Sequence, residues 1–232
     1  MAGYGTVERN GRDDKAGRYM KKRLLLLGAG GHCRSIIDAL KNDEYAEIGI
    51  VNKEGYSYMS VDGVPIVGED EDLESLFAQG WEYAFVAVGS VGDTNIRRQL
   101  FNSAKRIGFK LPVIIDKTAC VSKNVFVGEG VFVGKNAVIN SNARVGIGAI
   151  INSGAIIEHD CKIGEFAHIS PGAVLCGGVS IGRDTHIGAN ASVREGILVG
   201  DNCIVGIGSV VVTDLSKGVL AYGNPCREIV KA

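Results

Sequence analysis

Aliphatic residues recur at every sixth position through the second half of the chain, from residue 121 to residue 211. The position four residues further on is mostly alanine, valine or cysteine, and the residue directly after the aliphatic one is often glycine or asparagine. A period of six matches neither an α-helix nor an ordinary strand, so it indicates a repeat architecture. The sixteen aliphatic positions are Val121, Val127, Val133, Ile139, Val145, Ile151, Ile157, Ile163, Ile169, Leu175, Ile181, Ile187, Val193, Val199, Val205 and Val211.

This period predicts a coil built from short strands, with six residues on each side. The aliphatic residue fills the axis, the small residue lies beside it, and glycine or asparagine relieves the corner. Three sides close a coil, and successive coils stack about 4.8 Å apart, so the series makes a little over five coils. Ile115 with Ala119 indicates one further repeat. We expect a parallel β-helix over residues 113–216 and a C-terminal tail over residues 217–232.

The first half of the chain has a different pattern, in which short apolar runs alternate with amphipathic segments. Such an alternation of strands and helices is typical of a parallel sheet covered by helices, so we expect a small Rossmann-like α/β domain over residues 20–112. Residues 1–19 are polar and lack apolar periodicity, which is typical of a tag or a disordered extension. Strands are expected over 24–27, 48–51 and 83–88, and helices over 33–40, 72–77 and 95–107.

Composition and charge exclude several functional classes. The chain has 25 Lys and Arg against 26 Asp and Glu, a formal net charge of −1, and so lacks the charge pattern for binding nucleic acid or an anionic membrane. No apolar run approaches the roughly 18 residues of a membrane span, and no signal-peptide pattern is present. Six scattered cysteines without a C-x-x-C pair indicate free thiols, so we expect a cytoplasmic protein.

Candidate chemistry lies first at the histidines of the repeat region, all at positions expected to face outward. His168 and His186 are 18 residues apart, so they are expected to stack on adjacent coils. His159 is followed by Asp160, and an imidazole beside a carboxylate is equipped to act as a general base near neutral pH. A surface histidine with a coincidental acidic neighbour is the simpler interpretation. A zinc site from the three histidines is a further alternative, although their spacing matches no zinc motif.

A second candidate is the glycine-rich stretch of residues 28–32, Gly-Ala-Gly-Gly-His, between a predicted strand and a predicted helix. Such a turn allows close backbone approach and presents helix N–H groups to an anion such as a nucleotide phosphate. Cys33 takes the place of the last glycine of a dinucleotide motif. Asn52 and Lys53 stand where a dinucleotide enzyme has an acidic residue, which argues against NAD. The alternative is a tight turn in which His32 caps the helix.

The combination of these features resembles a family of bacterial enzymes. A Rossmann-like domain with a G-x-G-G-H turn, a β-helix containing I-E-H-D-C-K-I-G-E-F-A-H-I-S-P-G-A at 157–173, and a terminal G-N-P at 223–225 are similar to the nucleotide-sugar acetyltransferases. This family includes UDP-4-amino-sugar N-acetyltransferases of bacillosamine-type pathways, perosamine N-acetyltransferases and sialic acid O-acetyltransferases. The resemblance covers residues 21–232. It implies a left-handed β-helix and a homotrimer with a coenzyme slot between neighbouring β-helices.

The resemblance also implies roles for individual residues. His159 would be the general base, and Asp160 would raise its basicity. The acetyl-CoA would be bound by His168 near the thioester, by the backbone N–H of Gly177 as oxyanion donor, and by the backbone around Ala189 and Ile207. The nucleotide sugar would contact Gly30, Gly31, His32, Asn52, Lys53 and Gly89.

The chain departs from many relatives at the sugar end. Asn52 and Lys53 replace a pair of aspartates, Ser90 replaces an asparagine, and Cys33 replaces a glycine. The expected function is acetyl-CoA-dependent N-acetylation of a nucleotide-linked 4-amino-6-deoxy sugar by direct transfer, without a metal. The alternatives are O-acetylation of a sialic acid or related sugar, a non-catalytic trimeric β-helix module, and a zinc hydratase. The sequence leaves the sugar and its nucleotide open.

Overall fold

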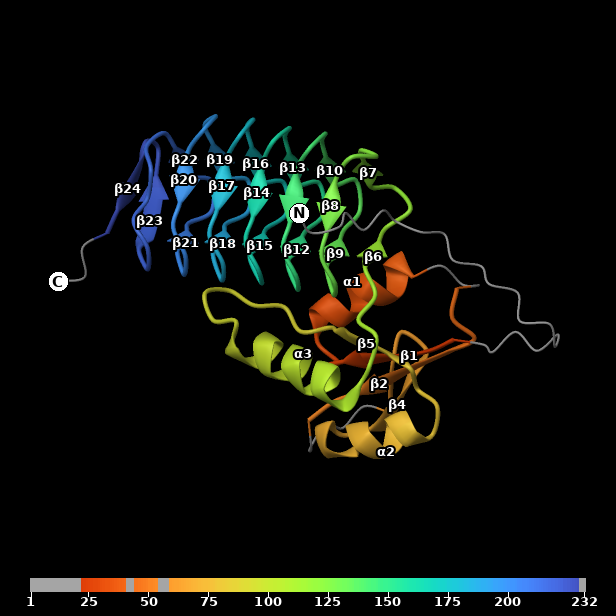
Figure 1. Ribbon diagram of the computed structural model, residues 1–232. Coiled ribbons are helices and arrows are strands. Elements are labelled where there is room, and N and C mark those ends of the chain that lie inside the picture. Colours follow the sequence, from red (N-terminus) through yellow and green to blue (C-terminus); the bar gives the residue numbers. More distant parts are fainter. Residues whose placement is uncertain (1–21, 41–43, 54–58, 230–232) are drawn as a thin grey trace, which may run out of the picture.

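The computed structural model describes residues 22–40, 44–53 and 59–229. The extension predicted over residues 1–19 lies outside these ranges. The chain forms an α/β unit packed against one side of a β-helix, as Figure 1 shows. In the part of the chain that is described, no helix combines the length and the apolar character that crossing a membrane requires.

The α/β unit is built on a five-stranded sheet in the order β3-β4-β2-β1-β5, with β1 paired in parallel to β2 and to β5. The four leucines of β1 are fully buried because helices cover both faces of the sheet. Leu24 and Leu26 pack with residues of α1, whereas Leu25 and Leu27 pack with residues of α2 and α3. The elements are β1 (Arg23–Leu27), α1 (Gly31–Ala39), β2 (Glu47–Val51), β3 (Ser60–Val61), β4 (Val64–Gly68), a 3-10 turn (Asp70–Asp72), α2 (Leu73–Ala78), β5 (Tyr83–Val86) and α3 (Asn95–Ile107).

The sequence pattern predicted the central strands and the helices of this unit but not the hairpin of β3 and β4. The hairpin turns at Asp62 and Gly63, which both have positive φ, and β4 joins the edge of β2. An Asp-Gly pair with two positive φ angles is a strong hairpin signal that the apolar periodicity of such short strands does not reveal.

The β-helix follows the predicted period, because each two-residue strand ends on an aliphatic position of the series. Strands 18 residues apart pair in parallel and in register, as Ile139, Ile157 and Leu175 do. The strands are β6 (Ile114–Ile115), β7 (Cys120–Val121), β8 (Phe126–Val127), β9 (Phe132–Val133), β10 (Val138–Ile139), β11 (Arg144–Val145), β12 (Ile150–Ile151), β13 (Ile156–Ile157), β14 (Lys162–Ile163), β15 (His168–Ile169), β16 (Val174–Leu175), β17 (Ser180–Ile181), β18 (His186–Ile187), β19 (Ser192–Val193), β20 (Leu198–Val199), β21 (Ile204–Val205) and β22 (Val210–Val211).

These strands form three faces, which we number in chain order. Face I consists of β6, β9, β12, β15, β18 and β21, and ends in β23 (Leu220–Gly223) and β24 (Cys226–Glu228). Face II consists of β7, β10, β13, β16, β19 and β22, and face III of β8, β11, β14, β17 and β20. The chain turns three corners per coil, named I–II, II–III and III–I after the faces that they join. The aliphatic series and the alanine series fill the axis and are almost completely buried.

The corners correct one detail of the expected repeat. The left-handed backbone lies three residues after the aliphatic position, as at Asn142 and Asp160, and not directly after it. The residue directly after the aliphatic one is glycine in every coil of corner III–I because the next coil is too close for a side chain. A Cβ atom on Gly164 would lie 2.4 Å from the backbone nitrogen of Arg183. These glycines are Gly128, Gly146, Gly164, Gly182 and Gly200.

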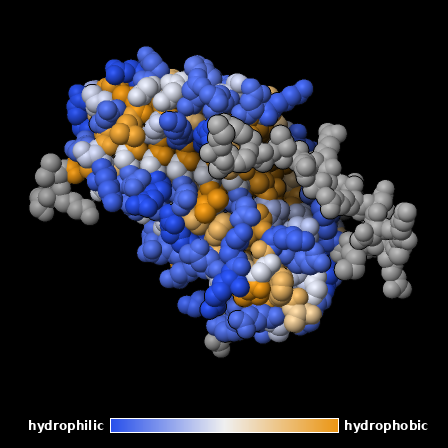
Figure 2. Space-filling model, viewed as in Figure 1, coloured by the Kyte–Doolittle hydropathy of each residue, from blue (hydrophilic) through white to orange (hydrophobic). Residues whose placement is uncertain are grey.

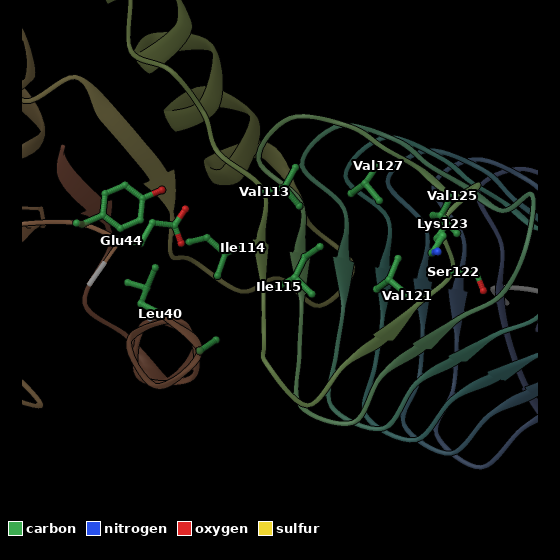
Figure 3. Close-up of a pocket in the computed structure, with 12 residues that line it drawn as sticks. Leu40, Glu44, Val113, Ile114, Ile115, Val121, Ser122, Lys123, Val125 and Val127 are labelled. Atoms are coloured by element: carbon green, nitrogen blue, oxygen red, sulfur yellow. The ribbon is translucent and has the colours of Figure 1, made fainter. Parts of the chain in front are cut away.

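The two ends of the β-helix differ. At the C-terminal end, β23 and β24 form an antiparallel hairpin whose Ala221 and Cys226 close the core. At the other end, a largely apolar cavity of about 740 Å³ separates the first coil from the end of α1. Figure 3 shows Val121 and Val127 of the first coil on one side of this cavity and Leu40 on the other.

The α/β unit is fastened to face I through α3. Arg98 forms two hydrogen bonds of 2.7 Å with the carboxylate of Asp184, and the rings of Phe101 and Phe166 meet edge to face. Figure 1 shows α1 and α3 beneath face I of the β-helix. This packing creates a cleft between the two halves of the chain.

Candidate active site

Corner II–III carries the predicted base. The imidazole Nδ1 of His159 lies 2.8 Å from Oδ2 of Asp160, and both side chains are exposed. Asn142, from the preceding coil, donates a hydrogen bond of 2.5 Å to Oδ1 of Asp160. The hydrogen bonds from Asn142 and His159 lower the pKa of Asp160, so this carboxylate is ionised at neutral pH. An ionised Asp160 accepts the proton of Nδ1, which leaves the lone pair of Nε2 on His159 facing outward.

Gly177 lies on the next coil, directly against the imidazole. A Cβ atom at this position would be 2.7 Å from both Cε1 and Nε2 of His159, so the ring occupies the space that a side chain would need. The next residue, Gly178, donates its N–H to the carbonyl of His159. The N–H of Gly177 has no acceptor within the described ranges. An unpaired backbone donor therefore lies next to an oriented base.

The residues predicted to line the coenzyme slot lie on another corner. Ala189 and Ile207 stack 18 residues apart on corner I–II, in one column with Ser153 and Pro171. The side chain of Ile207 is 80% exposed, and the N–H groups of Ala189 and Ile207 find no acceptor in the described part of the chain. Corners I–II and II–III are the two edges of face II. One side of six residues, about 20 Å, separates them.

His168 and His186 stack on adjacent coils of face I as predicted, with ring centroids 4.9 Å apart. They point outward from the coil, but His186 is buried and His168 is only half-buried, because the α/β unit covers much of this face. Nδ1 of His168 donates to the carbonyl of Ser90 at 2.8 Å, and Nε2 lies 3.2 Å from the amide nitrogen of Asn152. Burial lowers the pKa of His168 to about 4, so the ring is neutral with both nitrogens engaged.

The cleft between the two halves of the chain has a volume of about 510 Å³. It brings three of the predicted sugar-binding residues, Gly31, His32 and Gly89, together with His168. Gly30 is the N-cap of α1, and neither Gly30 nor Gly31 has an atom within 4 Å of the place where a Cβ would be. The lining residues are Gly31, His32, Ser35, Gly89, Ser90, Val91, Asn152, Ser153, His168 and Pro171.

His32 contributes a neutral imidazole to this cleft. Its ring meets Phe132 edge to face at 5.1 Å, and burial lowers its pKa to about 3. Nε2 of His32 is buried without a hydrogen-bond partner in the described part of the molecule. The alternative that His32 caps α1 is wrong. The N-cap residue is Gly30, and no side chain forms a capping hydrogen bond at this end of the helix.

Asn52 and Lys53 do not line the cleft, in contrast to the sequence-based expectation. Instead, the side-chain oxygen of Asn52 accepts a hydrogen bond of 3.0 Å from the N–H of Ala29, and so holds the glycine-rich turn. Lys53 is exposed after the end of β2. Asn52, directly after β2, therefore stabilises the glycine-rich turn through its hydrogen bond to Ala29.

Sequence reasoning missed Asn152 as a residue of the cleft. On corner I–II the residue directly after the aliphatic position is Gly134, Gly188 or Gly206 in three coils, but Asn152 and Ser170 in the two coils between them. This interruption of the glycine pattern is a signal that could have been used. The side chain of Asn152 contacts His168, and Ser170 contacts the ring of His186.

The three histidines considered as zinc ligands do not converge within one chain. His168 and His186 lie on face I, whereas His159 lies at corner II–III. Among the residues with described positions, no three His, Cys, Asp or Glu side chains come close enough to hold one ion.

Comparison with known proteins decides the family. Residues 23–104 match the model of the PglD N-terminal domain, and residues 178–213 match the hexapeptide repeat of succinyl-transferase. PerB from Caulobacter crescentus, solved with CoA and GDP-perosamine, is 38% identical, with 89% of this chain and 97% of PerB covered and a TM-score of 0.83. The acetyltransferase domain of PglB from Neisseria gonorrhoeae, solved with acetyl coenzyme A, is 36% identical, with 90% and 100% covered and a TM-score of 0.83. The chain belongs to the nucleotide-sugar N-acetyltransferases.

Membership in the nucleotide-sugar N-acetyltransferases confirms the predicted fold class, an α/β Rossmann-like domain followed by a left-handed β-helix. It also confirms the prediction of an enzyme that uses acetyl-CoA. WeeI from Acinetobacter baumannii AYE shares the fold at 20% identity, with 90% of this chain and 100% of WeeI covered and a TM-score of 0.78. No curated protein sequence matches the chain.

Proposed function

We propose that the protein transfers the acetyl group of acetyl-CoA to the 4-amino group of a nucleotide-linked 4-amino-6-deoxy sugar, with His159 as general base. The pairing of His159 with Asp160 beside the unpaired N–H of Gly177 carries this proposal. The family supports it, since PerB was solved together with CoA and GDP-perosamine. The perosamine enzyme from Caulobacter crescentus is an N-acetyltransferase, which favours transfer to an amine over the alternative of O-acetylation of a sialic acid.

The proposed chemistry needs a proton acceptor and an oxyanion donor. Acetyl-CoA supplies the acetyl group as a thioester, and coenzyme A is released as the thiol. Nε2 of His159 accepts the proton that the amine loses as its nitrogen bonds to the thioester carbon. Asp160 holds Nδ1–H and stabilises the imidazolium, which then gives its proton to the departing sulfur. The N–H of Gly177 donates to the carbonyl oxygen while that oxygen is negatively charged.

The acceptor sugar nucleotide would bind in the cleft. The N-terminus of α1, with Gly30 and Gly31, offers backbone N–H groups to a diphosphate, and the absence of side chains there allows close approach. The ring of His32 is neutral and its Nε2 has no partner among the described residues, so it offers a hydrogen-bonding group without a charge, whereas the neutral ring of His168 forms part of the cleft wall. For acetyl-CoA, the exposed Ile207 and the unpaired N–H groups of corner I–II fit a long ligand that contains amides. Asn52 is proposed to act on substrate only through the turn.

A complete site requires more than one chain. His159 lies at one edge of face II and the coenzyme column at the other, about 20 Å away, whereas proton transfer needs a contact of about 3 Å. The outward side chains of face II are Cys120, Val138, Ile156, Val174, Ser192 and Val210, an uncharged row that is only partly covered. Figure 2 shows that hydrophobic side chains reach the surface of the β-helix among polar ones.

We therefore propose a homotrimer in which face II of each protomer packs against a neighbour. This arrangement joins corner II–III of one chain to corner I–II of the next, and forms three equivalent sites. Six free cysteines favour a reducing compartment, so the enzyme is proposed to act in the cytoplasm.

The chemistry is tested by measuring release of free thiol from acetyl-CoA in the presence of UDP- and GDP-linked 4-amino-6-deoxy sugars and of free sialic acids. The expected result is rapid release with one amino sugar. His159→Ala should reduce turnover by about 100- to 10,000-fold, the range for a general base. Glu195→Ala, two coils further along the same corner, is the matched control and should retain activity. Full activity of His159→Ala would refute the assignment of the base, and release only with a sialic acid would refute N-acetylation.

A further inference from the structure

Arg97 is a buried cation at the junction of the two halves of the chain. It lies on α3 and is only 3% exposed. Its guanidinium donates 3.0 Å hydrogen bonds to the hydroxyl of Ser90 and to the carbonyl of Phe166, and a further bond to the carbonyl of Gly148. Within the described ranges no carboxylate forms an ion pair with Arg97, in contrast to its neighbour Arg98.

Burying this guanidinium costs free energy because it loses its hydration, and the charge of Asp184, which is paired with Arg98, offsets that cost only in part, since burial still lowers the pKa of Arg97 to about 10. Fastening α3 to the β-helix does not require this buried cation. Arg98 already binds Asp184 through two hydrogen bonds, and Phe101 packs on Phe166. Of the three hydrogen bonds of Arg97, those to the carbonyls of Phe166 and Gly148 reach the β-helix, whereas the one to Ser90 leads to the cleft.

Ser90 connects Arg97 to both walls of the cleft. Its hydroxyl accepts from Arg97, and its carbonyl accepts the hydrogen bond of 2.8 Å from Nδ1 of His168. Ser90 itself lines the cleft, between Gly89 and Val91. A shift of the Arg97 guanidinium would therefore move the loop at one wall and release the imidazole at the other.

The charge of Arg97 also reaches the cleft. Burial is the main cause of the lowered pKa values of His32 and His168, and the charge of Arg97 lowers both further. The two rings are thus neutral, and Arg97 is the buried positive charge behind them. A positive charge at this depth is weakly screened by solvent and attracts an anionic ligand in the cleft.

On the basis of the proposed function, we propose that Arg97 is a positioning residue for the diphosphate of the nucleotide sugar. Through Ser90 it fixes the width of the cleft, and its buried charge favours an anionic group there. It would not take part in the acetyl transfer at corner II–III. The hydroxyl of Ser90 is the group that accepts the Arg97 hydrogen bond.

The test uses calorimetric binding of UDP and GDP as probes, with acetyl-CoA as a second ligand. Arg97→Gln removes the positive charge. Arg97→Lys keeps the charge but lacks the planar guanidinium with its several N–H donors in fixed directions. We expect Arg97→Gln to weaken binding of the preferred diphosphate by about tenfold or more, as for the loss of a buried charge at an interface. Arg97→Lys should lie between this variant and the wild type. The affinity for acetyl-CoA should change by less than about threefold in both.

Arg98→Gln and Arg98→Lys are the matched controls, since Arg98 joins the same helix to the same β-helix without reaching the cleft. They should lower the melting temperature but change diphosphate affinity by less than about threefold. Because a buried charge is weakly screened, the difference in affinity between the wild type and Arg97→Gln should persist when salt is added. Wild-type affinity in Arg97→Gln would overturn the proposal, and so would an equal loss in Arg98→Gln, which would indicate a purely structural role.

If Arg97→Gln does not fold, Ser90→Ala removes the same link at its other end and leaves the backbone carbonyl for His168. Weaker diphosphate binding with unchanged acetyl-CoA binding supports the proposal, and unchanged binding of both overturns it. A wild-type protein that binds neither UDP nor GDP would refute the nucleotide-sugar substrate itself. That result is distinguishable from failure of the Arg97 inference, in which wild type and variant bind equally well.

Discussion

Replacing Gly177 with alanine tests the geometry of the proposed base without changing its chemistry. The added Cβ would lie 2.7 Å from Cε1 and Nε2 of His159 and 3.3 Å from Nδ1. Carbon atoms in contact prefer about 3.5–4.0 Å, so the imidazole has to move away by about 1 Å. The backbone of Gly177 is outside the left-handed region, and alanine can adopt it without strain.

The displacement of the imidazole determines how much turnover is lost. A misplacement of about 1 Å in a reacting group costs about 100-fold in rate, or about 2.7 kcal/mol of transition-state stabilisation. Stability should change little, because His159 is exposed and its ring has room to move outward. The assay is thiol release from acetyl-CoA with the accepted amino sugar, with the melting temperature measured in parallel. We expect kcat to fall about 100-fold at a nearly constant melting temperature.

The double variant His159→Ala/Gly177→Ala separates displacement of the ring from any other effect. If Gly177→Ala acts by moving the imidazole, it has nothing to move once that ring is absent. The double variant should then be as active as His159→Ala alone. Full activity of Gly177→Ala, or a further 100-fold loss in the double variant, would refute the reasoning.

Three other predictions follow from burial and packing. The pKa values of His32 and His168 are lowered from 6.5 to about 3 and about 4, so only the unfolded state binds their protons at mildly acidic pH. Urea unfolding should therefore show stability falling below pH 6.5 by about 1.4 kcal/mol per pH unit for each histidine, whereas a flat profile would contradict their burial. Val174→Asp on face II should dissociate the proposed trimer in light scattering and abolish activity, with the circular dichroism spectrum retained, and an unchanged molar mass would contradict the assignment of face II to the interface. Gly164→Ala places a Cβ 2.4 Å from the backbone nitrogen of Arg183 and should destabilise the fold by about 1–3 kcal/mol in thermal unfolding.

The β-helix was predictable because its signal is local and repeated. Each aliphatic position has the same environment, so the same residue class recurs in every coil. The corners were predicted less well because the left-handed position accepts several residue types. Asn142, Asp160 and Gly178 occupy it in three successive coils of corner II–III, and Phe166 occupies it at corner III–I. The glycines directly after the aliphatic position are required for a different reason, the approach of the next coil, and the sequence does not separate these two causes.

One part of the candidate site was predictable from local sequence, and the other part was not. His159 and Asp160 are adjacent in sequence, so their pairing could be predicted without knowledge of the fold. The cleft depends on contacts over long separations, such as that of Ser90 with His168 and that of Arg97 with Phe166. Which face of the β-helix receives the α/β unit is decided by complementary surfaces, and no periodicity carries that information.

The proposed general base and the cleft lie on different parts of the β-helix, so acetyl transfer and recognition of the sugar nucleotide depend on different residues. The proposed acetyl-transfer groups are backbone atoms and one side-chain pair on corner II–III, and their geometry is set by the coil. The acceptor cleft is formed by loops of the α/β unit docked on face I, and Asn52 shapes one of these loops from behind. Because the two sets of residues lie on different faces, substitutions in the loops can change the accepted sugar nucleotide without disturbing the base. Asn52, Lys53 and Ser90, the positions where the resemblance predicts departures from many relatives, all lie in the α/β unit, which is where a change of acceptor would be encoded.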